Sequence, residues 1–481
     1  MTSPGGSTEK RFLSSALSAY GSQFGRVLIR TAAELALARL IVPEGWGVFS
    51  LARAVTIVAA LLRDSGTTYH LVRDRREPWG EVLAWVLSTG ALISALLMLW
   101  PQPLAFFDPS LPEVMRWFGL WVFLDGVAVV PKVFFERRLA VRQLVAPEIL
   151  RGALYATVAI TLAALGHGVW SLVIGELAAA AFYAAAVWFR ARGRIPLGCD
   201  PGRLPGLLRK SALLLLIALA AVPIPYVQRF FVAAYDSAGS EAVGFFDKAY
   251  EWGLRLQILI LPAFLRVVYP ALVEYRGDRR RLVDAYRLGT VTILALETLA
   301  AYFLFFNAEV VLVNILLGDQ WPEAVPLLKI LCFLPLVDPF TRLGGEVLKV
   351  REEDRLWLLI VLVNMASLLT FGFLLAAPFG APGMAWANYL LLGNLVMAWR
   401  MAKICGPDFW HLLRELLFVY LVPLPAFALV AWAFPDGSWS RFAASVVAGA
   451  LAAAVLILRF RAPVMGFFFA PAGHADKEAS S

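Results

Sequence analysis

The sequence has few charged residues for its length. Of its 481 residues only 16% are charged, whereas soluble domains carry about 25%. Apolar residues form 60% of the chain and give it a mean hydropathy of +0.72. This composition excludes an ordinary soluble domain and predicts a polytopic membrane protein.

Residues that build catalytic and metal centres are also scarce. The three cysteines, Cys199, Cys332 and Cys405, form no CxxC pair, and the four histidines are isolated. These spacings suggest neither a disulfide nor a zinc site. The chain contains no Walker loop, no HExxH motif and no constellation for nucleophilic or metal catalysis. We therefore expect a protein that is not an enzyme, with no cofactor and no metal, and we do not expect an ATP-driven pump.

Long apolar runs fill most of the chain. A helix needs about 20 apolar residues to cross a bilayer, and the sequence contains about fourteen such runs. They are rich in Leu and Ala and show no sustained alternation, so we predict helices, which satisfy their own backbone hydrogen bonds in lipid. The predicted fold is therefore an all-α integral membrane protein. The expected spans are residues 18–41, 46–68, 80–100, 113–134, 146–165, 169–189, 210–234, 242–270, 285–306, 322–345, 355–376, 382–402, 413–433 and 440–460.

Basic residues mark every second loop. Lys and Arg lie in the N-terminal segment, in alternate loops and near the C-terminus, whereas the intervening loops contain neither. The net charge of +8 is therefore a signal of topology and not of a nucleic-acid partner. This alternation predicts a multi-pass protein with both termini in the cytoplasm. The loops without Lys or Arg are residues 43–45, 101–112, 166–168, 236–241, 307–320, 377–382 and 435–440.

The two halves of the chain resemble each other faintly. The pattern E-x-x-G-x-F occurs at residues 44–49, after the first span, and again at 241–246, after the seventh. Six is an even number of spans, so the repeats would be parallel. We predict two pseudo-symmetric six-helix lobes and two additional C-terminal helices. The predicted parts are an N-terminal lobe at 1–190, a Gly- and Pro-rich cytoplasmic linker at 191–210, a C-terminal lobe at 211–404, extra helices at 405–460 and a cytoplasmic tail at 461–481.

The first span contains charged residues at bilayer depth. At about 100° per residue, Gln23, Arg26, Arg30 and Glu34 fall within roughly 80° of one helix face. A charge at that depth costs at least ~2.5–3.5 kcal/mol, and Arg26 and Arg30 repel each other because they lie one turn apart. Glu34 can neutralise only one of them. We therefore predict that this face meets an anionic substrate.

Other spans also contain charged residues. Arg53 lies in the second span at roughly the depth of Arg30, and Asp247, Glu251 and Arg255 share one face of the eighth. Glu251 and Arg255 have two interpretations, as site residues or as an ion pair that only joins helices. Both interpretations stay open.

Three more carboxylates lie within predicted spans. Asp125 is in the fourth span, and Asp338 is in the tenth, one turn before Arg342. The alternative of a simple ion pair applies to Asp338 and Arg342 as well. For Glu176, in the sixth span, we predict a contact between helices in preference to ligand binding.

Four short stretches occur in a characteristic order. They read LARLIVPEGWGVFSLA at 37–52, ALGHGVWSLV at 164–173, RVVYPAL at 266–272 and GDQWPEAVPLL at 318–328. Together they resemble polysaccharide transporters of the oligosaccharide flippase (Wzx-type) family. The resemblance implies membership of the multidrug/oligosaccharidyl-lipid/polysaccharide exporter superfamily. It also implies a protein of the bacterial cytoplasmic (inner) membrane that flips undecaprenyl-pyrophosphate-linked glycans to the outer leaflet.

The resemblance also implies where the substrate binds. In related lipid flippases, arginines on helices one, two and eight face a central cationic cavity. The expected substrate-binding residues here are Arg26, Arg30, Arg53, Arg255 and Gln23. The carboxylates expected to contact sugar hydroxyls or a coupling ion are Glu34, Asp247, Glu251, Asp338 and Asp125.

We therefore predict a flippase that moves polyprenyl-pyrophosphate-linked oligosaccharide by alternating access, for cell-surface or exopolysaccharide synthesis. The expected partners are that lipid-linked glycan, the lipid bilayer and other glycan-assembly proteins. Two alternatives stay open. A cation-coupled small-molecule exporter on the same fold should have a net acidic site. A membrane glycan polymerase or ligase usually has a large outer loop with catalytic Arg or His, and the outer loops here are short.

Overall fold

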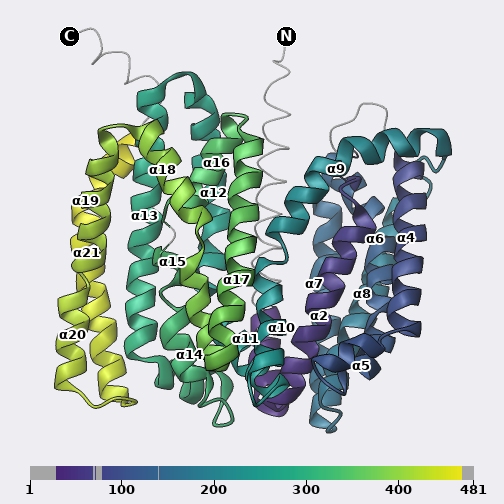
Figure 1. Cartoon of the computed structure of the whole chain (residues 1–481), viewed down its shortest axis with the longest axis horizontal. Helices are drawn as coiled ribbons and strands as arrows, with labels where there is room; N and C mark the ends of the chain where they lie inside the picture. The colour runs from purple at the N-terminus through teal and green to yellow at the C-terminus, as the bar shows by residue number, and fades with distance from the viewer. Residues whose placement is uncertain (1–28, 69–70, 72–77, 139, 338, 469–481) are drawn as a thin grey trace. The chain divides into compact units, whose positions relative to one another are not determined.

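The computed structural model describes residues 29–68, 71, 78–138, 140–337 and 339–468 (Figure 1). Within these ranges the chain forms helices and turns and contains no strand. The prediction of an all-α membrane protein is confirmed, because many of these helices are long and apolar.

The number of membrane spans differs from the predicted number. Among the described residues, 11 helices are long and apolar enough to cross a membrane, or up to 12 if the bent pair Ala324–Val337 and Pro339–Val350 forms one span. The predicted count of about fourteen is not confirmed. One candidate, Asp354–Cys405, has 52 residues and covers two of the expected spans, with non-helical backbone at Gly380 (φ 57°, ψ −137°). Residues 18–28 of the expected first span lie outside the described residues.

The chain divides into two compact units, residues 1–244 and 245–481. The domain boundaries predicted from the sequence, with a linker at 191–210, describe a different division and stay a prediction. We describe each unit by itself.

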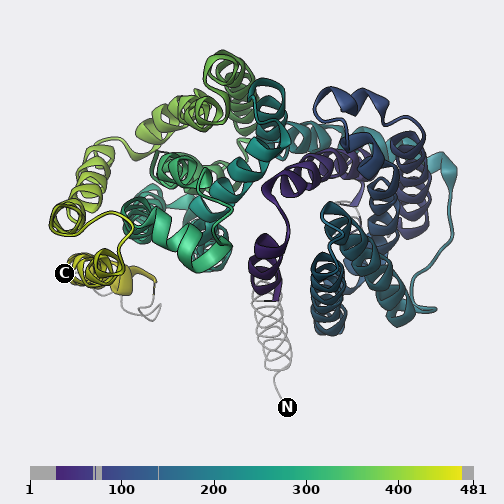
Figure 2. The ribbon, with the colours of Figure 1, turned by 90° about the horizontal axis from the view of Figure 1, so that it is seen from below.

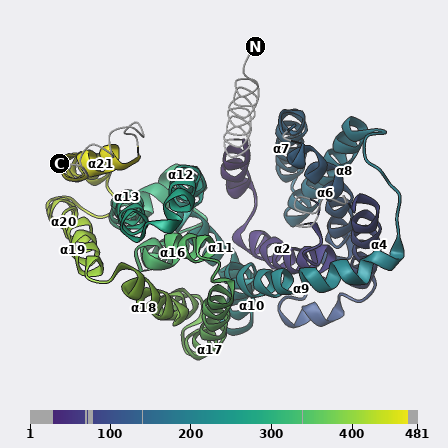
Figure 3. The same cartoon turned by 90° about the horizontal axis from the view of Figure 1, so that it is seen from above.

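The first unit is a bundle of helices in which α6, α7 and α8 lie side by side (Figure 3). Several of its helices have proline at their first or second position, where the N–H group that proline lacks would have no partner within the helix. After a helix at 29–40, the elements are α2 (Pro43–Asp64), α4 (Trp79–Leu99), η1 (Gln102–Phe106), α5 (Leu111–Phe118), α6 (Leu120–Arg137), α7 (Arg142–Ala164), α8 (Val169–Ala191), η2 (Pro201–Arg203), α9 (Leu204–Ala221) and α10 (Ile224–Tyr235). The helix α11 (Ser240–Gly253) begins where this unit ends.

A buried arginine anchors α2 to α6. The side chain of Arg63 is 1% exposed, and its Nη2 lies 3.2 Å from Oδ2 of Asp125. Its Nε donates a hydrogen bond of 2.7 Å to Asp64, and its Nη1 donates another to the Val122 carbonyl. A Cβ on Gly126 would lie 3.0 Å from the Arg63 side chain. Glycine therefore makes room for this arginine between the helices.

The repeated E-x-x-G-x-F pattern marks a close backbone contact. A Cβ on Gly47 would lie 1.7 Å from the Ser240 carbonyl oxygen, and a Cβ on Gly244 would lie 2.1 Å from the Pro43 carbonyl oxygen. The two glycines thus make reciprocal contacts between the start of α2 and the start of α11. Only glycine permits backbones to approach this closely.

The second unit is organised around α13 (Arg279–Phe306), which packs against α12, α16, α19 and α21. These helices run from teal to yellow in Figure 2. The core of this unit includes Tyr286, Leu343 and Met397, all nearly inaccessible. The remaining elements are α12 (Arg255–Glu274), η3 (Tyr275–Gly277), the π-helix η4 (Val310–Leu317), α14 (Ala324–Leu331), α15 (Leu334–Val337), α16 (Pro339–Val350), α17 (Asp354–Ala387), η5 (Asn388–Leu390), α18 (Gly393–Cys405), α19 (Asp408–Leu421), α20 (Leu424–Ala433) and α21 (Trp439–Phe468).

Candidate functional site

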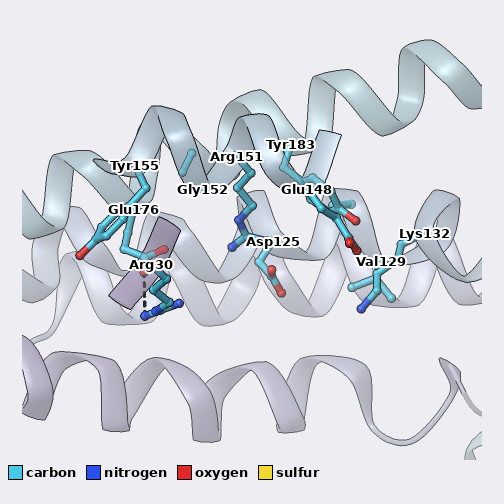
Figure 4. Close-up of a pocket in the computed structure, with 12 residues that line it drawn as sticks. Arg30, Asp125, Val129, Lys132, Glu148, Arg151, Gly152, Tyr155, Glu176 and Tyr183 are labelled. Atoms are coloured by element: carbon cyan, nitrogen blue, oxygen red, sulfur yellow. Dashed lines mark ion pairs between the residues drawn. The ribbon is translucent and has the colours of Figure 1, made fainter. Parts of the chain in front are cut away.

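Arg30, one of the predicted substrate-binding residues, is paired with two carboxylates. Its Nε lies 2.9 Å from Oε1 of Glu34, one turn along the same helix. Its Nη2 lies 3.6 Å from Oε1 of Glu176 on α8, as the dashed line in Figure 4 shows. The Arg30 side chain is nevertheless 43% exposed. Arg30 is therefore neutralised by neighbouring acids without being sealed inside the unit.

Arg53, predicted to lie at the depth of Arg30, meets the same carboxylate. Its Nη1 lies 3.4 Å from Oε1 of Glu176, whose side chain is 9% exposed. One carboxylate oxygen therefore faces two arginines from two other helices. The predicted contact between helices and the predicted anion-binding arginines are thus parts of one arrangement.

A cavity of about 410 Å³ opens beside Arg30. Its walls come from α6, α7 and α8, and Figure 4 shows its charged side chains on all three helices. Three basic and three acidic residues line it, so the formal charges balance. These six residues are Arg30, Lys132, Arg151, Asp125, Glu148 and Glu176. The described lining is therefore not the purely cationic surface that the family resemblance implies.

The wall formed by α7 contributes residues that are absent from the predicted set. Glu148, Arg151 and Tyr155 are spaced three and four apart, so they share one face of α7. The guanidinium carbon of Arg151 lies 5.2 Å from the centroid of the Tyr183 ring on α8, close enough for a cation–π interaction. The signal in the sequence is this helical spacing of polar residues within an expected span.

The other predicted residues of the N-terminal region have different outcomes. Asp125 lines the cavity and also pairs with Arg63, so it belongs both to the site and to the α2–α6 anchor. Gln23 and Arg26 lie outside the described residues, and their predicted roles stay predictions.

The second unit has a charged cluster of its own on α11 and α12. Glu251 places Oε1 2.5 Å from Nη1 of Arg255 and Oε2 3.3 Å from Nζ of Lys248. Arg255 also lies over the Trp252 ring, 5.0 Å from its centroid. Lys248, whose side chain is 2% exposed, is absent from the predicted set, whereas the predicted residue Asp247 lies half-buried on α11.

The predicted pair of Asp338 with Arg342 cannot be placed in full. Asp338 lies outside the described residues, and Arg342 forms an ion pair with Glu297 on α13. The role of Asp338 therefore stays a prediction.

A family model described as "Polysaccharide biosynthesis protein" matches residues 36–326, which is more than half of the chain. The chain belongs to the polysaccharide biosynthesis protein family. The family predicted from the four ordered stretches is therefore confirmed.

Two curated relatives support this membership. The chain is 25% identical to the succinoglycan biosynthesis transport protein ExoT of Rhizobium meliloti (strain 1021) over 305 residues, which are 61% of this chain and 60% of ExoT. It is 22% identical to the teichuronic acid biosynthesis protein TuaB of Bacillus subtilis (strain 168) over 230 residues, which are 46% of this chain and 47% of TuaB. The chain thus spans about half to three-fifths of the length of these relatives.

Solved structures show the fold of the family member described here. The structure of the lipid II flippase MurJ in an inward closed conformation matches with a TM-score of 0.74 at 12% identity, covering 93% of this chain and 100% of MurJ. An inward-facing multidrug resistance MATE family transporter of the MOP superfamily matches with a TM-score of 0.62 at 15% identity, covering 80% of this chain and 96% of that one. At these identities the likeness establishes the fold alone.

Proposed function

We propose that this protein flips a polyprenyl-diphosphate-linked oligosaccharide across a membrane during polysaccharide assembly. The observation that carries the proposal is the meeting of Arg30 and Arg53 at one carboxylate oxygen of Glu176, beside an accessible cavity. Membership of the family and the similarity to ExoT, a succinoglycan biosynthesis transport protein, support the same conclusion.

The two arginines suit a diphosphate for a chemical reason. A guanidinium group is planar and donates parallel hydrogen bonds to two oxygens, which matches phosphate geometry. Glu176 Oε1 lies within 3.6 Å of both guanidinium groups, so it marks a position from which an anionic oxygen reaches both. A phosphate oxygen in that position would bind Arg30 and Arg53 together. Arg26, Gln23 and Arg255 are further proposed substrate-binding residues.

The cavity has a size and lining that suit a headgroup. Its volume of about 410 Å³ lies within the range of about 300–1,000 Å³ that is usual for small-molecule sites. Tyr155 and Tyr183 supply aromatic faces, while Asp125 and Glu148 supply acceptors for sugar hydroxyls. We propose that the cavity holds the diphosphate and the sugar nearest to it, while the polyprenyl chain stays in lipid.

We propose a bacterial inner membrane location with both termini in the cytoplasm, because basic residues occupy every second loop.

Alternating access is the proposed mechanism: the substrate stabilises whichever state closes around its charge. Other glycan-assembly proteins are proposed partners, since the lipid-linked glycan must be built before it is flipped and consumed afterwards.

A cation-coupled exporter on the same fold is less well supported. Such a protein needs a net acidic site, whereas the described cavity has equal numbers of acidic and basic residues. The assay below separates the two functions.

The test is transport by the purified full-length chain in proteoliposomes. Three fluorescent substrates are compared: a polyprenyl-diphosphate oligosaccharide, the same glycan on a monophosphate, and a drug-like organic cation. We expect the diphosphate substrate to reach the opposite leaflet fastest, measured as the loss of protection from an impermeant quencher. Transport of the cation alone would establish the exporter instead.

A further inference from the structure

Glu176 places one carboxylate oxygen at a position from which a single anionic oxygen reaches both Arg30 and Arg53. Its Oε1 is 3.6 Å from Arg30 Nη2 and 3.4 Å from Arg53 Nη1. A substrate anion therefore has to displace this carboxylate or share the arginines with it. If the proposed function is correct, Glu176 competes directly with the substrate headgroup.

Charged and titratable groups face Glu176 from every side of the bridge. Arg30 and Glu34 come from the first helix, and Arg53 comes from α2. Arg151 and Tyr155 come from α7, and both interact electrostatically with the Glu176 carboxylate. Asp125 on α6 lines the same cavity.

The bridge is electrically neutral before substrate arrives. Arg30 and Arg53 carry two positive charges, and Glu34 and Glu176 carry two negative charges. A diphosphate diester adds two negative charges, so the occupied bridge would have a charge of minus two within the membrane. Uncompensated charge at this depth is costly, and like charges at contact distance favour protonation of one of them.

We propose that Glu176 is a proton-binding site that is loaded when a diphosphate headgroup binds to Arg30 and Arg53. The proposal rests on the proposed function and adds its coupling ion. One proton from the surrounding aqueous solution binds the Glu176 carboxylate, which becomes a neutral carboxyl group and no longer holds Arg30 and Arg53 by its charge, while Arg30 keeps its ion pair with Glu34. The arginines then donate to the phosphate oxygens, and the proton leaves when the headgroup does.

Glu176 is better placed for this role than Glu34. Protonation of Glu34 would remove one of the two carboxylates that pair with Arg30 and would leave the contacts of Glu176 with Arg30 and Arg53 unchanged. Protonation of Glu176 weakens the contacts of both arginines together and leaves Arg30 paired with Glu34.

The experiment measures proton uptake on binding to the full-length chain in detergent. The probe is a citronellyl diphosphate glucose diester, whose phosphates do not titrate near neutral pH. Calorimetry in two buffers with different protonation enthalpies gives the number of protons taken up per probe. For the wild type we expect close to one proton between pH 7 and 8, and a Kd that rises by up to about tenfold per pH unit.

Three variants assign the proton. Glu176→Gln should bind the probe without proton uptake, with a Kd that is independent of pH and lower than that of the wild type at pH 8. Glu176→Asp should keep the uptake. Glu113→Gln is the matched control, since it removes an exposed carboxylate on α5 of the same unit, outside the cavity lining, and leaves the Arg30–Glu176–Arg53 bridge in place.

Each outcome decides the proposal. Proton uptake that persists in Glu176→Gln, or that disappears in Glu34→Gln instead, assigns the proton to another group and overturns it. Probe binding by the wild type without uptake also overturns it, and this result does not depend on the folding of any variant. If the wild type does not bind the probe at all, the proposed function itself fails.

Discussion

Replacing Arg30 with alanine is the most direct test of the proposed diphosphate site. The change removes one of the two guanidinium groups that face Glu176 Oε1. A hydrogen bond to a charged group contributes about 1.5–3 kcal/mol, and each 1.4 kcal/mol corresponds to about a factor of ten in affinity. We therefore expect Arg30→Ala to weaken binding of the lipid-linked diphosphate by about 10- to 150-fold.

Arg30→Lys separates charge from geometry. Lysine keeps the positive charge that neutralises Glu34 and Glu176 but loses the planar fork of donors. We expect a smaller loss of roughly threefold to tenfold. The alanine variant should also lose about 1–3 kcal/mol of stability, since Glu34 and Glu176 are nearly buried while Arg30 is 43% exposed.

The assay is flipping in proteoliposomes at subsaturating substrate, with rates expressed per folded protein. Arg116→Ala is the control, because Arg116 is an exposed arginine on α5 of the same unit. We expect the order wild type and Arg116→Ala, then Arg30→Lys, then Arg30→Ala. Equal rates for all four proteins would refute the assignment of Arg30 to the site.

Three further predictions concern the fold and its topology. Gly47→Ala should lower the free energy of unfolding by at least about 3 kcal/mol, because the new Cβ would lie 1.7 Å from the Ser240 carbonyl oxygen. The control Gly45→Ala, whose Cβ would meet the Ile41 side chain at 3.2 Å, should unfold near the wild-type temperature. Equal unfolding midpoints for both variants would contradict the close contact. Glu353, just before α17, accepts hydrogen bonds from Arg400 and Arg351, and chiefly the Arg400 bond holds its pKa below the ordinary value of 4.5 against the effect of burial. The contribution of Glu353 to stability is therefore present above pH 4.5 and is lost as the pH falls through the lower folded pKa. Glu353→Gln should lower the free energy of unfolding by about 1–2 kcal/mol at pH 7, and the difference from the wild type should disappear in acid. A difference that does not depend on pH would show that this carboxylate is not responsible. Finally, cysteines are introduced singly into a chain without its native cysteines. S110C should react with an impermeant maleimide added to intact cells, and G277C should react only after lysis. The reverse pattern of labelling would contradict the proposed topology.

The local features of the site are predictable from the sequence. Arg30 and Glu34 are four residues apart, and the helical period places them on one face, where the structure shows a 2.9 Å ion pair. Glu251 and Arg255 follow the same rule, and the open alternative of an ion pair between them corresponds to the observed 2.5 Å contact. In both cases the spacing alone brings the charges together.

The partners supplied by other helices are not predictable in this way. Arg53 and Glu176 are 123 residues apart, and no local period relates them. The same limitation applies to the glycines of the repeated pattern. The sequence shows that Gly47 and Gly244 occupy equivalent places, but only the structure shows that each faces a backbone carbonyl near the other.

By itself the sequence determined that this is an all-helical membrane protein of a polysaccharide-transport family, and it predicted arginines in the first two expected spans. These properties follow from hydropathy, helical spacing and short ordered motifs, all of which are local. Only the tertiary structure decided that the two arginines share an acidic partner and that the cavity beside them is balanced in charge. The physical reason is that burial forces each ion to find a counter-ion in space, and packing, not position along the chain, determines which residue supplies it.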